Sequence, residues 1–182
     1  MDDAAVMTAD DFLTARDTMP ERGQWSELIA GRPFHFDAPD VDHGDVLGHL
    51  TNRINALIAS GTPVFRAGLR VEHSPDTVRF PAVSFFDQPG RFDLIDREIL
   101  DEPPVWVVEV ASTPDRVRSI EARVAEYAAF GVKLLWVVEP SQQRVHEIGG
   151  EGVRVASGED TLSAVPLADF SATVQELFRP PT

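Results

Sequence analysis

The sequence predicts an α/β domain with a mixed central β-sheet flanked by helices. Residues 105–112 (VWVVEVAS) and 133–140 (KLLWVVEP) are almost continuously apolar, which is typical of strands whose two faces are both covered. A strongly helical pattern lies between them, and such a strand–helix–strand unit favours a parallel pair with a right-handed crossover. Hairpin patterns elsewhere add antiparallel pairs. The length of 182 residues predicts one domain over 1–182, of which we expect residues 1–7 to be flexible.

The N-terminal third of the chain predicts a short helix, a hairpin and a long helix. Residues 8–16 are expected to form the short helix, with Thr8 as the N-cap of a capping box. Two alternating runs over residues 25–36 predict a hairpin that turns near Gly31. The long amphipathic helix follows, and Gly61 is expected to end it. Its apolar residues at helical spacing are Val46, Leu47, Leu50, Ile54, Leu57 and Ile58.

The rest of the chain alternates strands and helices. The expected elements are a hairpin of strands 63–73 and 77–86, a polar excursion with a helical turn over 87–104, the first apolar strand, a helix over 113–131, the second apolar strand, a hairpin of strands 144–149 and 152–157, and a closing helix over 171–178. Pro114 suits the first turn of the helix over 113–131, and Gly131 ends that helix. Ser171 is the expected N-cap of the closing helix.

The composition excludes several kinds of site. The chain has no cysteine, so disulfides, thiolate metal sites and cysteine nucleophiles are ruled out. Its net charge of −14 argues against general coating of nucleic acid, because phosphate affinity comes from neutralising cations, but it leaves room for a local basic groove. The N-terminus is unlike a signal peptide, and no apolar run approaches the ~20 residues of a membrane span. We therefore expect a cytoplasmic protein without a membrane partner.

Glu109 is the most informative single residue, because it interrupts an apolar strand. It shares a strand face with Val107 and Ala111, and an unpaired buried carboxylate costs several kcal/mol. It therefore needs a cation, a metal ion or water. Arg123 borders the sheet-facing stripe of the next helix and could reach Glu109. The alternatives are that Glu109 lies at a solvated sheet end or in a structural ion pair, and that Arg123 lies on a solvated flank.

Glu27 and His43 are weaker candidates. Glu27 interrupts an apolar strand and equally well fits its polar face, and His43 opens a helix among acids, where a solvated role is common. The acids Asp37, Asp40, Asp42 and Asp45 lack metal-loop spacing. The sequence also lacks a phosphate-binding glycine loop, a nucleophile-elbow serine and a paired-histidine zinc motif.

Five stretches, in their order and spacing, resemble a known family. They are WSELIAGRP, DAPDVDHGDVLGHL, DTVRFPAVSFF, PPVWVVEVAS and EYAAFGVKLLWVVEP. The resemblance is to the bacterial Uma-two family of restriction endonucleases, a branch of the PD-(D/E)XK nuclease superfamily, and covers nearly the whole chain. It implies a restriction-endonuclease-like fold, DNA as the partner and Mg²⁺ or Mn²⁺ as the cofactor.

The resemblance also implies which residues occupy the catalytic positions. In that family a Pro-Asp pair supplies a metal-binding Asp, and the next core strand supplies a Glu followed by Val. A lysine on the following helix stands four residues before a tyrosine. Here the Glu is Glu109, the Val is Val110 and the tyrosine is Tyr127, whereas Arg123 stands in the lysine position and Ala82 in the Asp position.

Glu27 and His43 match the recurrent N-terminal Glu and the helix-opening His of the family. The metal ligands that remain by this resemblance are the Glu109 carboxylate and the Val110 backbone carbonyl, so binding of Mg²⁺ or Mn²⁺ is doubtful in this chain. The resemblance allows a homodimer, which the residues themselves do not establish.

The two departures from the family pattern impair the expected chemistry. Ala82 offers no oxygen ligand, and the guanidinium of Arg123 cannot deprotonate to act as a base. Lys133, the only lysine, begins the next strand and is a poor substitute. Asp76 and Asp87 would lie roughly 15–20 Å from position 82 along a straight strand.

Three hypotheses follow from this incomplete site. The first is a metal-dependent DNA endonuclease that is inactive or strongly impaired because its Pro-Asp acid was removed, naturally or by substitution. The second is a lapsed nuclease-fold module that binds nucleic acid or protein, and the third is a structural or oligomerisation protein. An aspartate codon at position 82 of the natural gene would favour the first, and an alanine codon the others.

Overall fold

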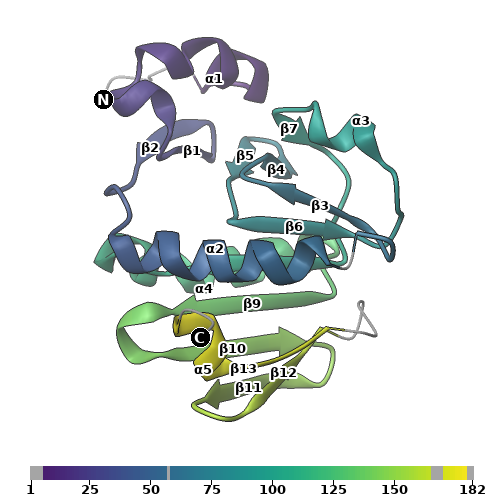
Figure 1. Cartoon of the computed structure of the whole chain (residues 1–182). Coiled ribbons are helices and arrows are strands. Elements are labelled where there is room, and N and C mark those ends of the chain that lie inside the picture. Colours follow the sequence, from purple (N-terminus) through teal and green to yellow (C-terminus); the bar gives the residue numbers. More distant parts are fainter. Residues whose placement is uncertain (1–5, 57, 165–169, 180–182) are drawn as a thin grey trace.

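Two mixed β-sheets and a two-stranded ribbon form the framework of the protein (Figure 1). The computed structural model describes residues 6–56, 58–164 and 170–179. The first sheet has the strand order β2 (Arg32–His35), β1 (Ser26–Ile29), β5 (Asp76–Arg79), β4 (Gly68–His73) and β7 (Ile99–Leu100). The second sheet has the order β11 (Gly152–Ser157), β10 (Arg144–Gly149), β9 (Leu134–Glu139), β8 (Trp106–Val110), β6 (Val83–Phe86) and β3 (Thr62–Phe65). The ribbon pairs β12 (Thr161–Ser163) with β13 (Ser171–Thr173).

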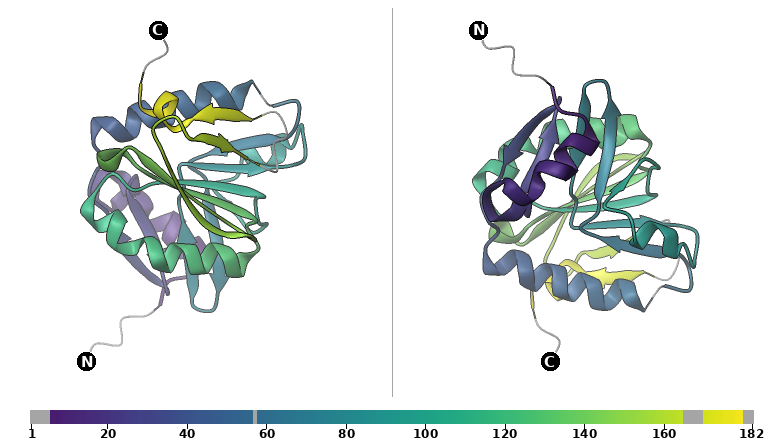
Figure 2. Two further views of the ribbon diagram at one scale, coloured as in Figure 1. Left: turned by 90° about the horizontal axis from the view of Figure 1, so that it is seen from below. Right: turned by 90° about the horizontal axis from the view of Figure 1, so that it is seen from above.

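The helices cover these sheets from several sides. They are α1 (Ala9–Ala15), α2 (Val41–Asn55), α3 (Phe92–Ile95), α4 (Pro114–Phe130) and α5 (Val174–Phe178), with three short 3₁₀ turns at Arg16–Thr18, Pro20–Gly23 and Pro140–Gln142. Figure 2 shows α2 and α4 on opposite sides of the second sheet. The apolar face of α2 packs with Val108 and Val110, whereas Tyr127 of α4 packs with Val107 and with the first sheet. None of the helices in the described ranges is long and apolar enough to span a membrane.

The predicted α/β class and most predicted elements are confirmed. β8, α4 and β9 form the expected parallel unit, and the hairpins β1–β2 and β10–β11 turn where the sequence predicts. The capping box of Thr8 begins α1. The strands of the expected central sheet are, however, shared between two sheets.

This division arises because two predicted strands each break in the middle. The predicted strand 63–73 breaks after β3, where Arg66 adopts the left-handed conformation with φ +59°, and resumes as β4 in the other sheet. The predicted strand 77–86 breaks between β5 and β6 at Pro81, which has no N–H to donate to a ladder. The stretch that contains Ala82 therefore passes from the first sheet to the second instead of running straight.

Two helix boundaries also differ from the prediction. Helix α2 ends at Asn55, before Ile58, and Leu57 lies outside the described residues. Gly61 does not cap the helix but packs against β6, where an added Cβ would lie 2.2 Å from the Phe86 carbonyl oxygen. At the C-terminus Thr173, not Ser171, caps α5, because the side chain of Glu176 completes a capping box with Thr173.

The N-terminal segment is attached to the first hairpin. The backbone N–H of Met7 donates to the carbonyl of Gly31 at 2.8 Å. Met7, within the segment 1–7 that was expected to be flexible, is therefore tied to the first hairpin, and residues 1–5 lie outside the described residues. The sequence analysis did not predict the two-residue strand β7 or the short strand β12.

Candidate active site

Five buried side chains meet where α4 passes between the two sheets, and we call them the Arg123 cluster. They are Glu27 of β1, Arg79 of β5, Glu109 of β8, and Arg123 and Tyr127 of α4. Each of them exposes at most 3% of its surface. Glu27 thus belongs to the buried face of its strand, although the sequence fitted a solvated face equally well.

Arg123 is the centre of this cluster. Its guanidinium donates to both carboxylate oxygens of Glu27, from Nη1 to Oε1 at 3.0 Å and from Nη2 to Oε2 at 2.8 Å. Nη1 also donates to Oε1 of Glu109 at 2.9 Å. The Tyr127 hydroxyl donates to the same Glu109 oxygen at 2.6 Å. The predicted contact between Arg123 and Glu109 is therefore present, in a buried ion pair.

Arg79 completes the neutralisation of Glu27. Nη1 of Arg79 donates to Oε2 of Glu27 at 3.0 Å, and its other nitrogens bind the carboxylate of Glu126 on α4 at 2.6 and 2.7 Å. The backbone N–H of Phe80 also donates to Glu27, at 3.2 Å. These bonds connect the first sheet to α4 through side chains alone.

The charges of the cluster fix the protonation states. Burial by itself would raise the pKa of Glu27, but Arg123, Arg79 and Arg116 together hold that pKa below its ordinary range. Burial opposes the charge of Arg123, yet Glu109 and Glu27 raise its pKa well above the ordinary value. Burial and the Glu109 charge raise the pKa of Tyr127, so its hydroxyl keeps its proton and donates a hydrogen bond to Glu109.

A cavity of about 260 Å³, which we call the basic cavity, opens directly above the Arg123 cluster. The predicted site residues that line it are Glu27, His43, Ala82, Glu109 and Val110. Arg123 and Tyr127 lie beneath it and touch Glu109. The structure therefore brings all seven predicted positions together.

Ala82 forms part of the cavity wall beside the strand that carries Glu109. Its backbone N–H donates to the Val108 carbonyl at 3.0 Å, and its side chain is 7% exposed. Among the described residues, neither flanking acid replaces the missing one: Asp76 is held by Arg70 and by the Ala9 N–H, both at 2.7 Å, and Asp87 lines a different cavity. Lys133 lies at the start of β9 and lines a different cavity.

His43, on the first turn of α2, is half-buried at the cavity edge and not fully solvated. Its Nδ1 lies 3.4 Å from the Ser112 hydroxyl. Burial, followed by the charges of Arg116 and Arg66, lowers the pKa of His43 to about 4, against the opposing charge of Asp40. The imidazole is therefore neutral at pH 7.

The sequence analysis missed three arginines that line the basic cavity, each packed on an aromatic ring. The guanidinium carbon of Arg16 lies 4.4 Å from the ring centre of Phe80, that of Arg66 lies 4.9 Å from Trp25, and that of Arg116 lies 5.1 Å from Phe36. None of the three forms a salt bridge with a carboxylate in the described parts of the chain. No sequence spacing indicates these pairs, because each one joins separate elements.

Arg116 is the least satisfied of these arginines. It is 7% exposed, and its buried Nε has no hydrogen-bond partner among the described residues. The neighbouring Asp115 does not neutralise it, because that carboxylate accepts the backbone N–H groups of Asp37 and of Arg116 itself, at 2.7 and 2.8 Å. A buried guanidinium without a partner is costly, and an anion in the cavity would satisfy it.

The residues around the basic cavity do not fit a divalent metal ion. Mg²⁺ is usually bound by one or two free carboxylates with water and phosphate oxygens. Here Oε1 of Glu109 accepts two hydrogen bonds, and the Ala82 side chain has no oxygen to offer. No group of three or more acidic or histidine side chains suited to a metal occurs in residues 6–56, 58–164 and 170–179.

The net charge around the cavity also favours an anion over a cation. The side chains that line the cavity include three arginines, Arg16, Arg66 and Arg116, and the two carboxylates of Glu27 and Glu109. The acids Asp115, Asp40, Glu98 and Asp17 lie near these arginines and His43 outside the lining. Since His43 is neutral, the lining itself holds one more arginine than carboxylate, although the whole chain carries −14. Such a lining suits an anionic group better than a cation.

Comparison with known proteins places the chain among nuclease-like proteins. Residues 10–175 match the model of the Uma2 family, which is described as "Putative restriction endonuclease". Among solved structures, the chain is similar to a protein from Anabaena variabilis ATCC 29413, described as "a putative nuclease belonging to DUF820". The alignment has a TM-score of 0.75 and 18% identity, and it covers 94% of this chain and 97% of the other. This likeness shows a shared fold. No curated protein sequence matched the chain.

Replacing Arg123 should destabilise the protein strongly. In the variant Arg123→Ala, Glu109 keeps only Tyr127 as a partner, and Glu27 keeps Arg79 and the Phe80 N–H. Breaking a buried ion pair in this way costs about 3–5 kcal/mol of unfolding free energy. Urea unfolding at pH 7 measures the loss. Arg118→Ala, an exposed arginine on the same helix, is the control and should stay within about 0.5 kcal/mol. Equal losses in both variants would contradict the central role of Arg123.

His43 should make the protein less stable in mild acid. Because its pKa is about 4 in the folded protein and 6.5 ordinarily, only the unfolded chain takes up this proton between those values. The unfolding free energy therefore falls as pH decreases from 6.5 towards 4, by at most about 1.4 kcal/mol per pH unit and by less in practice, since the half-buried ring is partly screened by solvent. Urea unfolding of His43→Gln at pH 7 and pH 5 should show a smaller drop than the parent. The exposed His73→Gln variant should behave like the parent, and a matching drop in His43→Gln would refute the effect.

Proposed function

The chain belongs to the Uma2 family of restriction-endonuclease-type proteins, and on this basis we propose that it binds the DNA phosphate backbone in the basic cavity without hydrolysing it. The observation that carries the proposal is the set of three arginines, Arg16, Arg66 and Arg116, which line the cavity without carboxylate partners in the described residues. Arginine suits this role because its planar guanidinium binds phosphate oxygens in pairs and stays charged at any physiological pH.

The aromatic rings beneath these arginines support the same role. Each ring supports a guanidinium on the cavity wall through its face. Nη2 of Arg16 also donates to the Gly23 carbonyl at 3.2 Å, which helps to fix its position. Phe36 contributes twice, because Arg123 also lies over it, at 4.9 Å. A preordered set of cations costs little entropy when a phosphate binds.

Hydrolysis requires groups that this cavity lacks. Restriction endonucleases generally use a divalent metal to polarise the phosphate and to generate the attacking hydroxide. The Arg123 guanidinium, which stands in the lysine position, keeps its proton and is committed to Glu27 and Glu109. The side chain of Ala82, beside the strand that carries Glu109, supplies no ligand. We therefore propose a lapsed endonuclease that retains phosphate binding, and not an active one.

The alternative is a metal-dependent endonuclease that a single substitution at position 82 has inactivated. Position 82 favours this reading in one respect, since its side chain already lines the cavity together with Glu109. An aspartate at that place would add a carboxylate beside the one that remains. The cleavage test below separates these two functions.

Binding of DNA should depend on Arg116 and on salt. We expect the parent chain to bind a fluorescein-labelled 20-base-pair duplex with an affinity that falls as salt rises, since bound phosphates release counterions. Arg116→Gln should weaken binding and lower the slope of log affinity against log salt by about one. Arg66→Gln is a second test variant, and because Arg66 is exposed, this substitution does not disturb the core. Arg118→Gln is the control, since Arg118 is exposed and does not line the cavity. Salt-insensitive or absent binding by the parent, or equal effects of Arg66→Gln and Arg118→Gln, would overturn the proposal.

The parent chain should not cleave DNA, and cleavage should require both aspartate at position 82 and lysine at position 123. We expect no nicking of supercoiled plasmid DNA by the parent chain in Mg²⁺ or Mn²⁺. Ala82→Asp combined with Arg123→Lys restores the oxygen ligand and the lysine, and should give metal-dependent cleavage. Ala82→Asn with Arg123→Lys is the matched control, since its neutral amide is a poor metal ligand. Metal-dependent cutting by the parent would show that the proposal is wrong, and cutting by Ala82→Asp alone would favour the inactivated endonuclease.

A further inference from the structure

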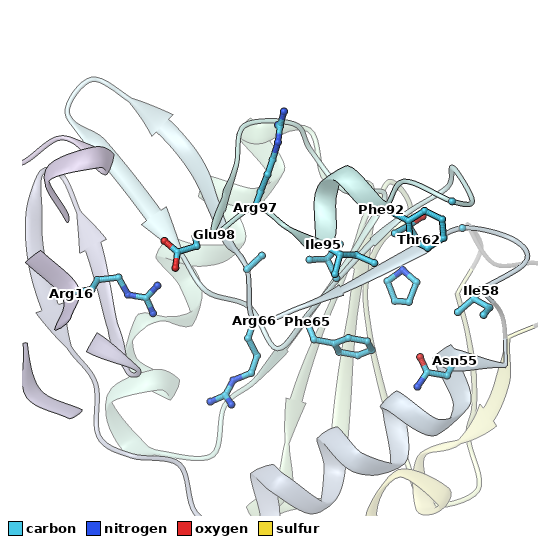
Figure 3. A pocket seen from close by; sticks show the side chains of 15 residues that line it. Arg16, Asn55, Ile58, Thr62, Phe65, Arg66, Phe92, Ile95, Arg97 and Glu98 are labelled. Atoms are coloured by element: carbon cyan, nitrogen blue, oxygen red, sulfur yellow. The ribbon is translucent and has the colours of Figure 1, made fainter. Parts of the chain in front are cut away.

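A second and larger cavity adjoins the basic cavity, and we call it the apolar cavity (Figure 3). Its volume is about 610 Å³, which is within the ordinary range of small-molecule sites. Arg16 and Arg66 line both cavities, so the two spaces meet at these side chains. A ligand group bound by these two arginines could therefore extend into both cavities.

The apolar cavity has a charged end and an apolar end. Figure 3 shows Arg16 and Arg66 together at one end, and Phe92 and Ile58 at the other, with Phe65 between them. The apolar side chains are unusually exposed: Phe92 is 72% exposed and Ile58 is 57% exposed. A Phe this exposed gains little from the core, and its free face is available to a planar ligand.

The charges on the lining suit an anionic chain. Three arginines, Arg16, Arg66 and Arg97, line the apolar cavity, and Glu98 is the single carboxylate among its lining residues. Arg66 and Arg97 form no salt bridge within the described residues. The whole chain carries a net charge of −14, whereas arginines outnumber carboxylates in the lining of this cavity, beside exposed aromatic and aliphatic side chains.

We infer that the apolar cavity receives the unpaired bases of a DNA strand whose phosphate lies in the basic cavity. Single-stranded nucleic acid is bound by a positively charged groove that follows the backbone and by aromatic side chains on which bases stack. The basic cavity supplies the positive charge for the phosphate, and the adjoining apolar cavity supplies the aromatic side chain for the base of the same nucleotide. A base pair within a duplex hides its faces, so only an unpaired or flipped-out base could stack on Phe92. The inference rests on the proposed function and adds a preference for unpaired DNA.

The inference is tested with three DNA ligands whose strands have the same length and the same number of phosphates. They are a labelled single-stranded 15-mer, an abasic 15-mer with the same phosphates, and the 15-base-pair duplex, each titrated with the full chain by fluorescence anisotropy at two salt concentrations. We expect the parent to bind the 15-mer more tightly than the abasic strand. Phe92→Ala should weaken binding of the 15-mer by about tenfold, with an unchanged salt slope and unchanged binding of the abasic strand. Phe92→Trp should retain the parent affinity.

Two controls keep the outcomes distinct. Val155→Ala removes an exposed apolar side chain on β11, away from both cavities, and should bind like the parent. Equal affinity of Phe92→Ala and the parent for the 15-mer, with Arg66→Gln still weakening all ligands, would overturn the inference and leave the proposed function standing. Absence of salt-dependent binding of any ligand by the parent would overturn both. Sedimentation velocity identifies the competing occupant: if Phe92→Ala dissociates a dimer and leaves DNA affinity unchanged, a second copy of the chain covers the apolar cavity.

Discussion

The buried contact of Arg123 with Glu27 and Glu109 is the interaction on which the rest of the structure depends. It joins β1 of the first sheet, β8 of the second sheet and α4, three elements that are far apart in the sequence. Two carboxylates without this guanidinium would be charged and desolvated at the contact between the sheets. The same contact also limits the chemistry, since it uses both oxygens of Glu27 and one oxygen of Glu109.

The substitutions at the two family positions have related consequences. Arginine in place of lysine brings a planar, permanently charged group that can hold two carboxylates at once, which a lysine ammonium cannot do with the same geometry. Alanine in place of aspartate removes one negative charge from the same wall. Under the proposed function, these two replacements together turn a site that would attract cations into one that attracts phosphate, on a fold that the chain shares with the Anabaena variabilis protein.

The sequence predicted most helices and strands and the proximity of the site residues. It did not predict where strands break or which distant segments contact one another. Apolar continuity in β8 and β9 and the periodicity of α4 were sufficient for the parallel unit, and Glu109 was identifiable because it interrupts that continuity. The break at Arg66 was not predictable, because an arginine at positive φ has no local signature. The rings beneath Arg16 and Arg116, and the role of Arg79, depend on contacts between distant segments, which a pattern along one segment cannot reveal.

The left-handed backbone of Arg66 shows how stability and ligand binding compete at one position. With φ at +59°, glycine or asparagine would occupy this turn with less strain, and the exposed side chain contributes little to the core. Arginine there is worse for folding, but it provides one of the two cations that line both cavities. Selection for thermal stability alone would therefore remove Arg66, and variants with a raised melting temperature at this position would leave Arg16 as the remaining shared cation.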